Sequence, residues 1–347
     1  ALVGVLAALL AYFGNPANMA ICIACFVRDT AGALKLHSAA PVQYFRPEIV
    51  GFAVGAFAIS LATNEYKATA GSSPMIRFVL GAIMVIGALV FLGCPLRMVL
   101  RMAAGDLNAY VALVGFAGGI ATGSFFLKKG FSLGRAYETQ KSSGYVLPVL
   151  LLALFIIGAV TGVYAASTEG PGSKHAPVLI SLVGALAQKS RMCFAGSIRD
   201  VILMKNFDLL SIIGALFAVM LIFNLATGNF HLSFSGQPIA HSQHLWNILG
   251  MYVVGFAAVL AGGCPLRQLI LAGQGSSDSA VTFLGMLIGA AFAHNFGLVG
   301  AAAKAATETE PAVAGGPAAA GKIAVIVCIV VLFVIAGTNL RRKKTAK

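Results

Sequence analysis

Long apolar stretches alternate with short polar connections along the whole chain. Eight of the stretches approach or reach the ~20 residues that a helix needs to cross a bilayer. They cover residues 49–62, 76–92, 109–127, 145–166, 209–227, 248–263, 280–300 and 323–338. Within each stretch the apolar residues are continuous rather than alternating with polar ones, which is typical of helices in lipid. The pattern therefore predicts a polytopic membrane protein built from helices.

Two further apolar stretches, 1–13 and 177–187, are too short to cross a bilayer. Eleven residues at ~1.5 Å rise per residue reach only about 17 Å, roughly half of the hydrocarbon thickness. Each stretch is followed by a polar break and a second apolar patch, at 19–27 and 192–198. We interpret each pair as one broken helix, whose irregular backbone must be covered by protein or by a water-filled cavity.

The composition agrees with lipid as the solvent. Hydrophobic residues make up 59% of the 347 positions and charged residues only 10%, with a mean hydropathy of +0.90. A soluble domain carries about 25% charged residues, so an ordinary soluble enzyme is excluded. The net charge of +13 would suggest nucleic acid in a soluble protein. Here the Lys and Arg residues of the connections and of the tail predict membrane orientation, with a cytoplasmic C-terminus and no nucleic-acid partner.

The sequence contains an internal repeat. The residues Gly-Cys-Pro-Leu-Arg at 93–97 recur at 263–267, and Cys22 with the Arg-Asp pair at 28–29 recurs as Cys193 with the pair at 199–200. Three glycine pairs keep the spacing of the first motif: Gly105 and Gly275, Gly115 and Gly285, and Gly119 and Gly289. The repeat divides the chain into a first membrane repeat at 1–168, a second at 172–340 and a basic tail at 341–347.

Each half holds one broken helix and four longer segments. If the broken helix crosses the bilayer, each half has an odd number of crossings and the second half is inverted. If it is re-entrant, four crossings per half make the halves parallel. The distribution of Lys and Arg favours inversion. The predicted fold is an all-α polytopic membrane protein of two pseudo-symmetric, inverted repeats, with about five hydrophobic segments each and short broken helices meeting near the midplane.

The duplicated Gly-Cys-Pro motif has a physical interpretation. Proline lacks an N–H and pushes the preceding residue out of the α region, so a helix should end or bend near Cys94 and Cys264. Arg97 and Arg267 follow three residues later. The free N–H groups of a new helical turn would act with them to attract an anion. The alternative is a helix end at the membrane surface with a snorkelling arginine. Because both halves carry the motif, we favour a substrate-binding role for these four residues.

The remaining cysteines carry less specific signals. Cys22 and Cys25 form a CxxC pair, which alone could bind a metal or act as a redox dithiol. The matching motif has Cys193 but Gly196 in place of the second cysteine. Cys25 is therefore a secondary candidate, and no metal site is predicted. Cys328 lies in the last apolar segment, where we expect a small hydrophobic side chain against helix or lipid.

Charged residues and histidines add further candidates. Arg28 and Arg199 should each form an ion pair with the aspartate that follows and so fix the broken helices; whether they also face a substrate is open. His294 could be a core histidine or could serve in substrate binding or proton transfer. A polar loop carries three more histidines, a weak metal signal: His231, His241 and His244. The sequence shows neither a carboxylate relay in the long segments nor a P-loop, so we expect no nucleotide hydrolysis and no cofactor.

These motifs resemble those of the YeeE/YedE family of sulfur transport membrane proteins. The resemblance rests on the segment Asn-Pro-Ala-Asn-Met at 15–19 before Cys22, on both Gly-Cys-Pro-Leu-Arg copies and on the two-half organisation. Residues 22–32 with 43–48 look similar to the YedE branch associated with selenium metabolism. The resemblance implies a transporter of the bacterial inner membrane, shaped like an hourglass that short helices narrow near the midplane.

Family members take up thiosulfate, and the resemblance implies that a few cysteine thiols pass it along by transient hydrogen bonds. That role falls here on Cys22, Cys94 and Cys264, with Cys193 added as the repeat mate of Cys22. Cys25 and Cys193 depart from the family pattern, so a selenium-containing anion or another reduced sulfur species is a further substrate candidate. A cytoplasmic sulfur-carrier protein of the TusA type is the implied partner.

The sequence therefore predicts a permease, not an enzyme, that moves a small sulfur- or selenium-containing anion along cysteine thiols. Two alternatives use the same cysteines. A membrane thiol–disulfide redox enzyme needs cysteines that can meet, and only Cys22 and Cys25 are adjacent. A soft-metal transporter would use the thiols as ligands. The duplicated Arg97 and Arg267 favour an anion, which they would attract at the two mouths of the pathway.

Overall fold

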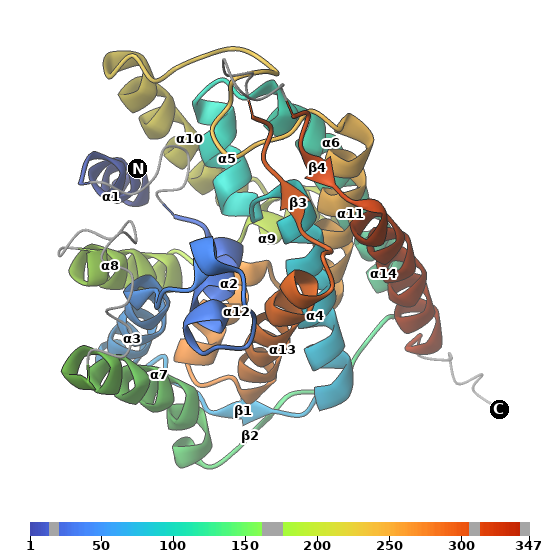
Figure 1. Ribbon diagram of the computed structural model, residues 1–347. Coiled ribbons are helices and arrows are strands. Elements are labelled where there is room, and N and C mark those ends of the chain that lie inside the picture. The colour runs from blue at the N-terminus through green and yellow to red at the C-terminus, as the bar shows by residue number, and fades with distance from the viewer. Residues whose placement is uncertain (14–20, 162–175, 305–312, 341–347) are drawn as a thin grey trace.

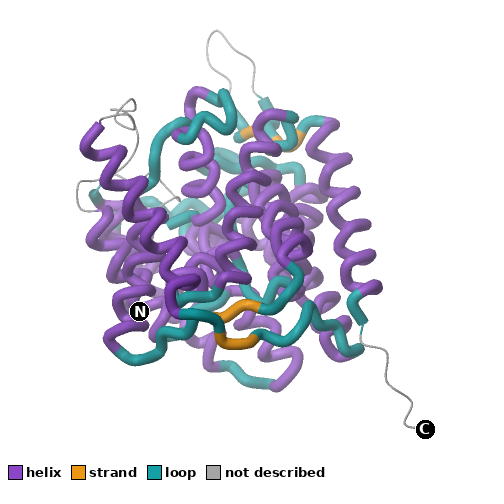
Figure 2. Tube along the Cα trace, turned by 90° about the horizontal axis from the view of Figure 1, so that it is seen from below, coloured by secondary structure: helices purple, strands orange, loops and turns teal. Residues whose placement is uncertain are grey.

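The computed structural model describes residues 1–13, 21–161, 176–304 and 313–340 (Figure 1). Figure 2 shows that helices predominate in this part of the chain, with loops and two short strand pairs between them. The α-helices are α1 (Leu2–Tyr12), α2 (Ile23–Ala33), α3 (Pro47–Ala62), α4 (Pro74–Phe91), α5 (Pro95–Ala103), α6 (Leu107–Lys128), α7 (Lys141–Thr161), α8 (Ala176–Lys189), α9 (Phe194–Met204), α10 (Asp208–Ala226), α11 (His244–Leu260), α12 (Pro265–Gly273), α13 (Ser277–Asn295) and α14 (Ala319–Thr338). A 3-10 helix η1 spans Ala40–Val42. Two antiparallel strand pairs complete the described elements: β1 (Thr69–Ala70) with β2 (Tyr137–Glu138), and β3 (Gly300–Ala301) with β4 (Gly316–Pro317).

Seven helical spans of the described chain are long and apolar enough to cross a membrane. They are Ala40–Ala62, Pro74–Ala103, Leu107–Lys128, Val178–Met204, Asp208–Ala226, His244–Gly273 and Ala319–Thr338. Their most apolar windows have mean hydropathies between 1.3 and 2.8. The chain is an all-α polytopic membrane protein, as its hydrophobic pattern predicts.

The two halves have the same order of helices. Two short helices are followed by two longer ones, a helix of nine residues and two more long ones, so that α1–α7 correspond to α8–α14. The break between α8 and α9 confirms the predicted broken helix of the second half. In the first half, residues 14–20, which connect α1 to α2 in the sequence and include the segment at 15–19, lie outside the described residues. The nine-residue helices α5 and α12 are additional to the predicted segments.

Long helices of one half pack against helices of the other. α4 packs against α13 and α6 against α11, while α3 packs against α8 and α1 against α10. Each of these contacts has a counterpart in which the halves exchange roles. Figure 1 shows the short helices α2, α9 and α12 near the middle of the molecule, with long helices around them. The inverted orientation of the halves and their boundaries at 1–168 and 172–340 stay predictions.

Glycines of the repeat allow these helices to approach closely. Gly115 and Gly119 of α6 lie against α11, and Gly285 and Gly289 of α13 lie against α4. A Cβ atom added at any of the four would come within 3.0 Å of a backbone atom of the partner helix. The spacing of four residues puts both glycines of a helix on one face, which is typical of close helix crossings in membranes.

The third glycine pair closes the turn after each nine-residue helix. Gly105 and Gly275 have φ angles of +88° and +111°, a backbone region that favours glycine. A connection from the other half runs along each turn. The N–H of Ser233 donates to the carbonyl of Gly105, and the N–H of Thr69 donates to that of Gly275. The repeated glycines therefore lie where the two halves interlock.

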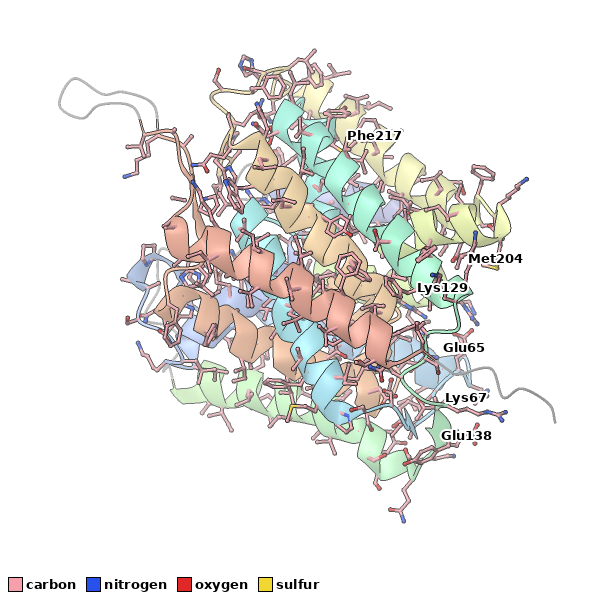
Figure 3. All side chains as sticks on the ribbon, turned by 90° about the vertical axis from the view of Figure 1, so that its right-hand side faces the viewer. Glu65, Lys67, Lys129, Glu138, Met204 and Phe217 are labelled. Atoms are coloured by element: carbon pink, nitrogen blue, oxygen red, sulfur yellow. The ribbon has the colours of Figure 1, made fainter. Side chains whose placement is uncertain are left out.

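Several charged side chains gather at one end of the bundle, where Figure 3 shows Glu65, Lys67, Lys129 and Glu138. The Nζ atom of Lys67 lies 3.8 Å from Oε1 of Glu138, and the Nζ atom of Lys189 lies 3.5 Å from Oε1 of Glu65. Exposed ion pairs of this kind contribute little to stability. The basic tail at 341–347, on which the predicted cytoplasmic C-terminus depends, lies outside the described residues.

Candidate functional site

Four cysteines occupy the same position in four short helices. Cys22, Cys94, Cys193 and Cys264 are the N-cap residues of α2, α5, α9 and α12, respectively. All four side chains are buried. The first N–H groups of a helix have no partner within it, and the helix dipole places partial positive charge there. Each thiol therefore stands where a bound anion is favoured.

The local sequence explains the caps of α5 and α12. Pro95 and Pro265 are the first residues of these helices, where the missing N–H has no intrahelical role to lose. A residue before proline prefers extended backbone. Cys94 has it with φ −81° and ψ 170°, and Cys264 with φ −67° and ψ 169°. The prediction that a helix ends near each of these cysteines is confirmed by α4 and α11.

The caps of α2 and α9 use the thiol itself. Sγ of Cys22 accepts a hydrogen bond from the N–H of Cys25 at 3.4 Å, and Sγ of Cys193 accepts one from the N–H of Gly196 at 3.2 Å. Both capping cysteines have extended backbone. The two copies of this motif therefore share one local geometry, although a glycine replaces the second cysteine in the second half.

The capping thiols meet in pairs, and each pair joins the two motifs of one half. Sγ of Cys193 lies 3.9 Å from Sγ of Cys264. In the first half, the side chains of Cys22 and Cys94 are within hydrogen-bonding reach of each other. The N-termini of α9 and α12 therefore converge, and so do those of α2 and α5. The repeat in the sequence identifies these four cysteines, and the structure shows which of them lie close to each other.

Cys25 extends the first pair. Its Sγ lies 2.8 Å from Sγ of Cys22 and accepts a hydrogen bond from Nη1 of Arg97 at 3.6 Å. Nη1 of Arg97 also donates to the carbonyl of Leu92 at 2.6 Å, in the turn before Cys94. The secondary candidate Cys25 thus lies in one buried cluster with three of the main candidates.

The two motif arginines have different surroundings. Arg97 is 1% exposed, so it lies buried beside the thiols rather than at an open mouth as the sequence suggests. Arg267 is partly exposed, and its Nη1 donates to Oε1 of the buried Gln188 at 3.3 Å. Of the two, Arg267 has the exposure that a residue at a mouth requires.

A second buried arginine follows Arg97 by one helical turn. Nε of Arg101 forms an ion pair with Oδ2 of Asp106 at 2.6 Å, and Nη1 donates to the carbonyl of Phe91 at 3.1 Å. The guanidinium lies 4.3 Å from the centre of the Phe91 ring. A spacing of four residues puts Arg97 and Arg101 on one face of α5. Sequence reasoning based on the repeat missed Arg101, because Leu271 stands at the matching position.

The predicted ion pair of the first broken helix is part of a larger buried network. Nη2 of Arg28 lies 2.6 Å from Oδ1 of Asp29. Arg46 joins the other carboxylate oxygen of Asp29 with its Nε at 2.9 Å, and its Nη1 lies 3.1 Å from Oε1 of Glu48. Arg46 and Glu48 were missed because they lie at a polar connection that looks solvated in the sequence.

The second broken helix has the matching pair in a more open setting. Nη2 of Arg199 lies 2.8 Å from Oδ1 of Asp200, and their side chains are 27% and 14% exposed. The carboxylate of Asp29 in the first half is fully buried by comparison. Both pairs thus have the charges within ion-pair distance, and the first pair is the more deeply buried of the two. A substrate role for Arg28 and Arg199 stays a prediction.

His294 lies near the Arg28 network. Its ring stacks on that of His37, with centroids 4.5 Å apart and planes inclined by 22°. Nε2 of His37 lies 3.0 Å from the carbonyl oxygen of Arg28. The structure therefore connects the last long helix before the C-terminal segment, α13, with the first broken helix. The choice between a core and a substrate role for His294 stays open.

The predicted loop of three histidines is divided by the fold. His241 is buried with its Nε2 2.9 Å from the carbonyl oxygen of Val90, and burial lowers its pKa. His244 is the first residue of α11 and thus belongs to a helix. Among the described residues, no three His, Cys, Asp or Glu side chains are grouped to hold a metal ion. Cys328 is buried within α14, as expected for a small hydrophobic side chain.

Comparison with known proteins bears on this arrangement. The family model described as sulphur transport matches residues 189–347, which include Cys193 and the second Gly-Cys-Pro-Leu-Arg copy. A search of curated proteins finds no match. The link to the selenium branch stays a prediction. The match over the second half, whose motifs recur in the first, supports the assignment of the chain to the YeeE/YedE family of sulphur transport membrane proteins.

Proposed function

We propose that the protein is a permease for a small sulfur-containing anion such as thiosulfate, or for a selenium-containing counterpart. The observation that carries this proposal is the placement of four buried cysteines at four helix N-termini, with the thiols paired within each half. In the fold, α2 contacts α12 and α5 contacts α9. The two thiol pairs therefore belong to one cluster of short helices, and we propose that they form successive stations of one pathway.

The chemistry of the substrate matches that of the stations. Sulfur and selenium anions are large, and their charge is diffuse, so weak donors can replace their water of hydration. A thiol is a weak hydrogen-bond donor, and the N–H groups of a helix N-terminus attract negative charge. Conduction requires binding that is strong enough to admit an ion and weak enough to release it. A series of thiols at helix N-termini satisfies both conditions.

The arginines add charge to each station. Arg97 contacts the first thiol cluster through Cys25, and Arg267 follows Cys264 in the same helix while remaining partly exposed. We propose that Arg267 attracts the anion at the open side of its station and that Arg97 holds it within the buried one. Arg28, Arg199 and His294 are secondary candidates for contact with the substrate.

Uptake by proteoliposomes tests the proposal. The full chain is reconstituted, and entry of labelled thiosulfate is compared with that of sulfate, selenite and selenide, with and without an ion gradient. Cys94→Ala and Cys264→Ala should each reduce thiosulfate uptake at least tenfold while leaving the elution profile of the protein unchanged. Cys328→Ala is the matched control, because Cys328 lies outside the thiol pairs, and should transport normally. Wild-type uptake by both pathway variants would refute the relay.

We also propose the cellular setting that the family resemblance implies. The protein would lie in the bacterial inner membrane as inverted repeats, with its C-terminus in the cytoplasm and a TusA-like sulfur carrier as its partner there. Alkaline phosphatase fused to the C-terminus should be inactive, and a green fluorescent protein fused at the same point should be fluorescent. The opposite pair of results would reverse the proposed orientation.

A further inference from the structure

The CxxC segment at the start of α2 holds two thiols in close contact. Cys22 is the N-cap residue of the helix and Cys25 lies one turn later, so the helix itself brings the two side chains to the same side. Their sulfur atoms are 2.8 Å apart. The separation is small enough for a disulfide, with its bond of about 2.05 Å, to form through side-chain movement alone. Both residues are at most 1% exposed.

Two features around this pair stabilise negative charge on sulfur and so offset part of the cost of forming the thiolate, the reactive form of cysteine, in a buried site. The N-terminus of a helix and a neighbouring guanidinium both stabilise negative charge on sulfur. Here Cys22 caps α2, and Nη1 of Arg97 lies 3.6 Å from Sγ of Cys25. The pair thus has the composition and the setting of a redox-active dithiol.

The second half lacks this feature. Gly196 stands in place of Cys25, although its N–H donates to Sγ of Cys193 just as the N–H of Cys25 donates to Sγ of Cys22. The thiol nearest to Cys193 is that of Cys264 on another helix, at the longer distance of 3.9 Å. The transport proposal assigns its role to one pair of capping thiols in each half, so it gives no reason for a further cysteine in the first half only.

We propose that Cys22 and Cys25 form a redox site that reacts with polythionates, which are sulfur anions with an internal sulfur–sulfur bond. The inference rests on the proposed function for the access of such an anion to the buried pair. A polythionate carries the same terminal S–SO₃ group as thiosulfate, so a pathway that admits thiosulfate presents the same recognition groups to it. Its internal S–S bond is the electrophile that a dithiol requires.

The reaction with tetrathionate balances in two steps. The Cys22 sulfur attacks one central sulfur of tetrathionate, the central S–S bond breaks, and thiosulfate leaves with the electron pair. The sulfur of Cys25 then attacks Sγ of Cys22, and a second thiosulfate leaves as the Cys22–Cys25 disulfide forms. The two thiols lose two electrons and two protons, and one tetrathionate is reduced to two thiosulfates. A dithiol reductant returns the site to its starting state.

Oxidation removes a station from the pathway. The disulfide consumes the hydrogen-bond donor of Cys22, which is also within reach of Cys94. Thiosulfate uptake should therefore fall when polythionate is present and recover after reduction. In this way an oxidised form of the substrate would close the permease reversibly.

The test uses the purified full chain in detergent and needs no transport. Reduced protein is treated with sodium tetrathionate, the thiosulfate released is measured, and the linked cysteines are mapped by mass spectrometry of unreduced peptides. Wild type should release two equivalents of thiosulfate and show Cys22 joined to Cys25. Cys25→Ser should stop after one equivalent with the adduct retained on Cys22, and the control Cys328→Ser should behave as wild type. Size-exclusion profiles establish that each variant is folded.

Several outcomes would overturn the inference. These are a Cys22–Cys94 or Cys193–Cys264 link in place of the proposed one, two equivalents released by Cys25→Ser, or all thiols still free after treatment. In proteoliposomes, uptake by oxidised wild type should fall at least tenfold and return with dithiothreitol; undiminished uptake would overturn the closing role. Formation of the Cys22–Cys25 disulfide in a chain that moves no thiosulfate would support the redox site and refute the transport proposal.

Discussion

Replacing Gly115 by alanine tests whether the close crossing of α6 and α11 stabilises the protein. A Cβ atom at this position would lie 2.6 Å from the carbonyl carbon of Ile248 and 2.8 Å from its Cα atom, and it would also meet the carbonyl oxygen. Carbon atoms in favourable contact are about 3.5–4.0 Å apart. The two helices would have to separate by roughly 1 Å, because the contact is with backbone that cannot rotate away.

The cost follows from that displacement. Overpacking a well-packed interior costs about 1–3 kcal/mol, and α6 and α11 share one of the main contacts between the halves. We therefore expect Gly115→Ala to destabilise the protein by about 2 kcal/mol, near the middle of that range. The measurement is the thermal unfolding midpoint of the detergent-solubilised chain, which should fall by a few degrees. The repeat mate Gly285 should respond alike, since its Cβ would lie 2.8 Å from the carbonyl carbon of Phe78.

Gly214 of α10 provides the matched control. An added Cβ at this glycine has no other atom within 4 Å, so alanine introduces no clash there and gains about 0.5–1 kcal/mol from reduced backbone freedom. Gly214→Ala should hold or raise the unfolding midpoint under the same conditions. Equal midpoints for Gly115→Ala and Gly214→Ala would refute the argument that backbone contact at the crossing matters.

Three further predictions concern charged groups. Arg101→Leu leaves the buried Asp106 without its ion-pair partner and should lower the free energy of unfolding by about 3–5 kcal/mol. The double variant Arg101→Leu with Asp106→Ser has the residues of the second half at both positions. It should recover much of the loss in unfolding midpoint and expression. Burial lowers the pKa of His241, so protonation of this side chain is disfavoured in the folded state. The stability of the protein should therefore decline as the pH falls below the ordinary histidine pKa of ~6.5. His241→Gln should weaken that decline in unfolding midpoints measured between pH 5 and 8. Glu138→Ala removes an exposed ion pair with Lys67, whose side chains are 78% and 66% exposed, and should leave the midpoint unchanged; a loss of several degrees would contradict the weakness of exposed pairs.

The hydrophobic pattern and the repeat predict much of this fold. Long helices have enough apolar residues to be found by length alone, and the break between α8 and α9 is visible as a polar interruption. The nine-residue helices α5 and α12 are too short for that signal, and buried arginines interrupt the apolar pattern of α5. Their start is nevertheless marked by Pro95 and Pro265, because proline favours the first position of a helix.

The candidate site could be predicted as a set of residues but not as an arrangement. Cys22 and Cys94 are far apart in the chain, and only tertiary packing brings them within reach. Comparison of the halves puts Cys25 in a secondary place because the second half has Gly196 there, and such a comparison misses features that belong to one half only. The burial of Arg46 could not be predicted either, because it depends on the ion pair with Asp29 and on the tertiary packing around it.

Because the two halves pack against each other, the helices of the first half enter the membrane before their partners in the second half exist. α4 and α6 enter the membrane before α13 and α11, against which they pack, have been synthesised. The faces of α4 and α6 that pack against these later helices therefore lie in lipid without native partners at first, so helix insertion and helix association are separated in time. Contacts between residues so distant in the chain also slow the final assembly. A fragment that ends after the first half would contain the packing faces of α4 and α6 but would lack the helices that cover them.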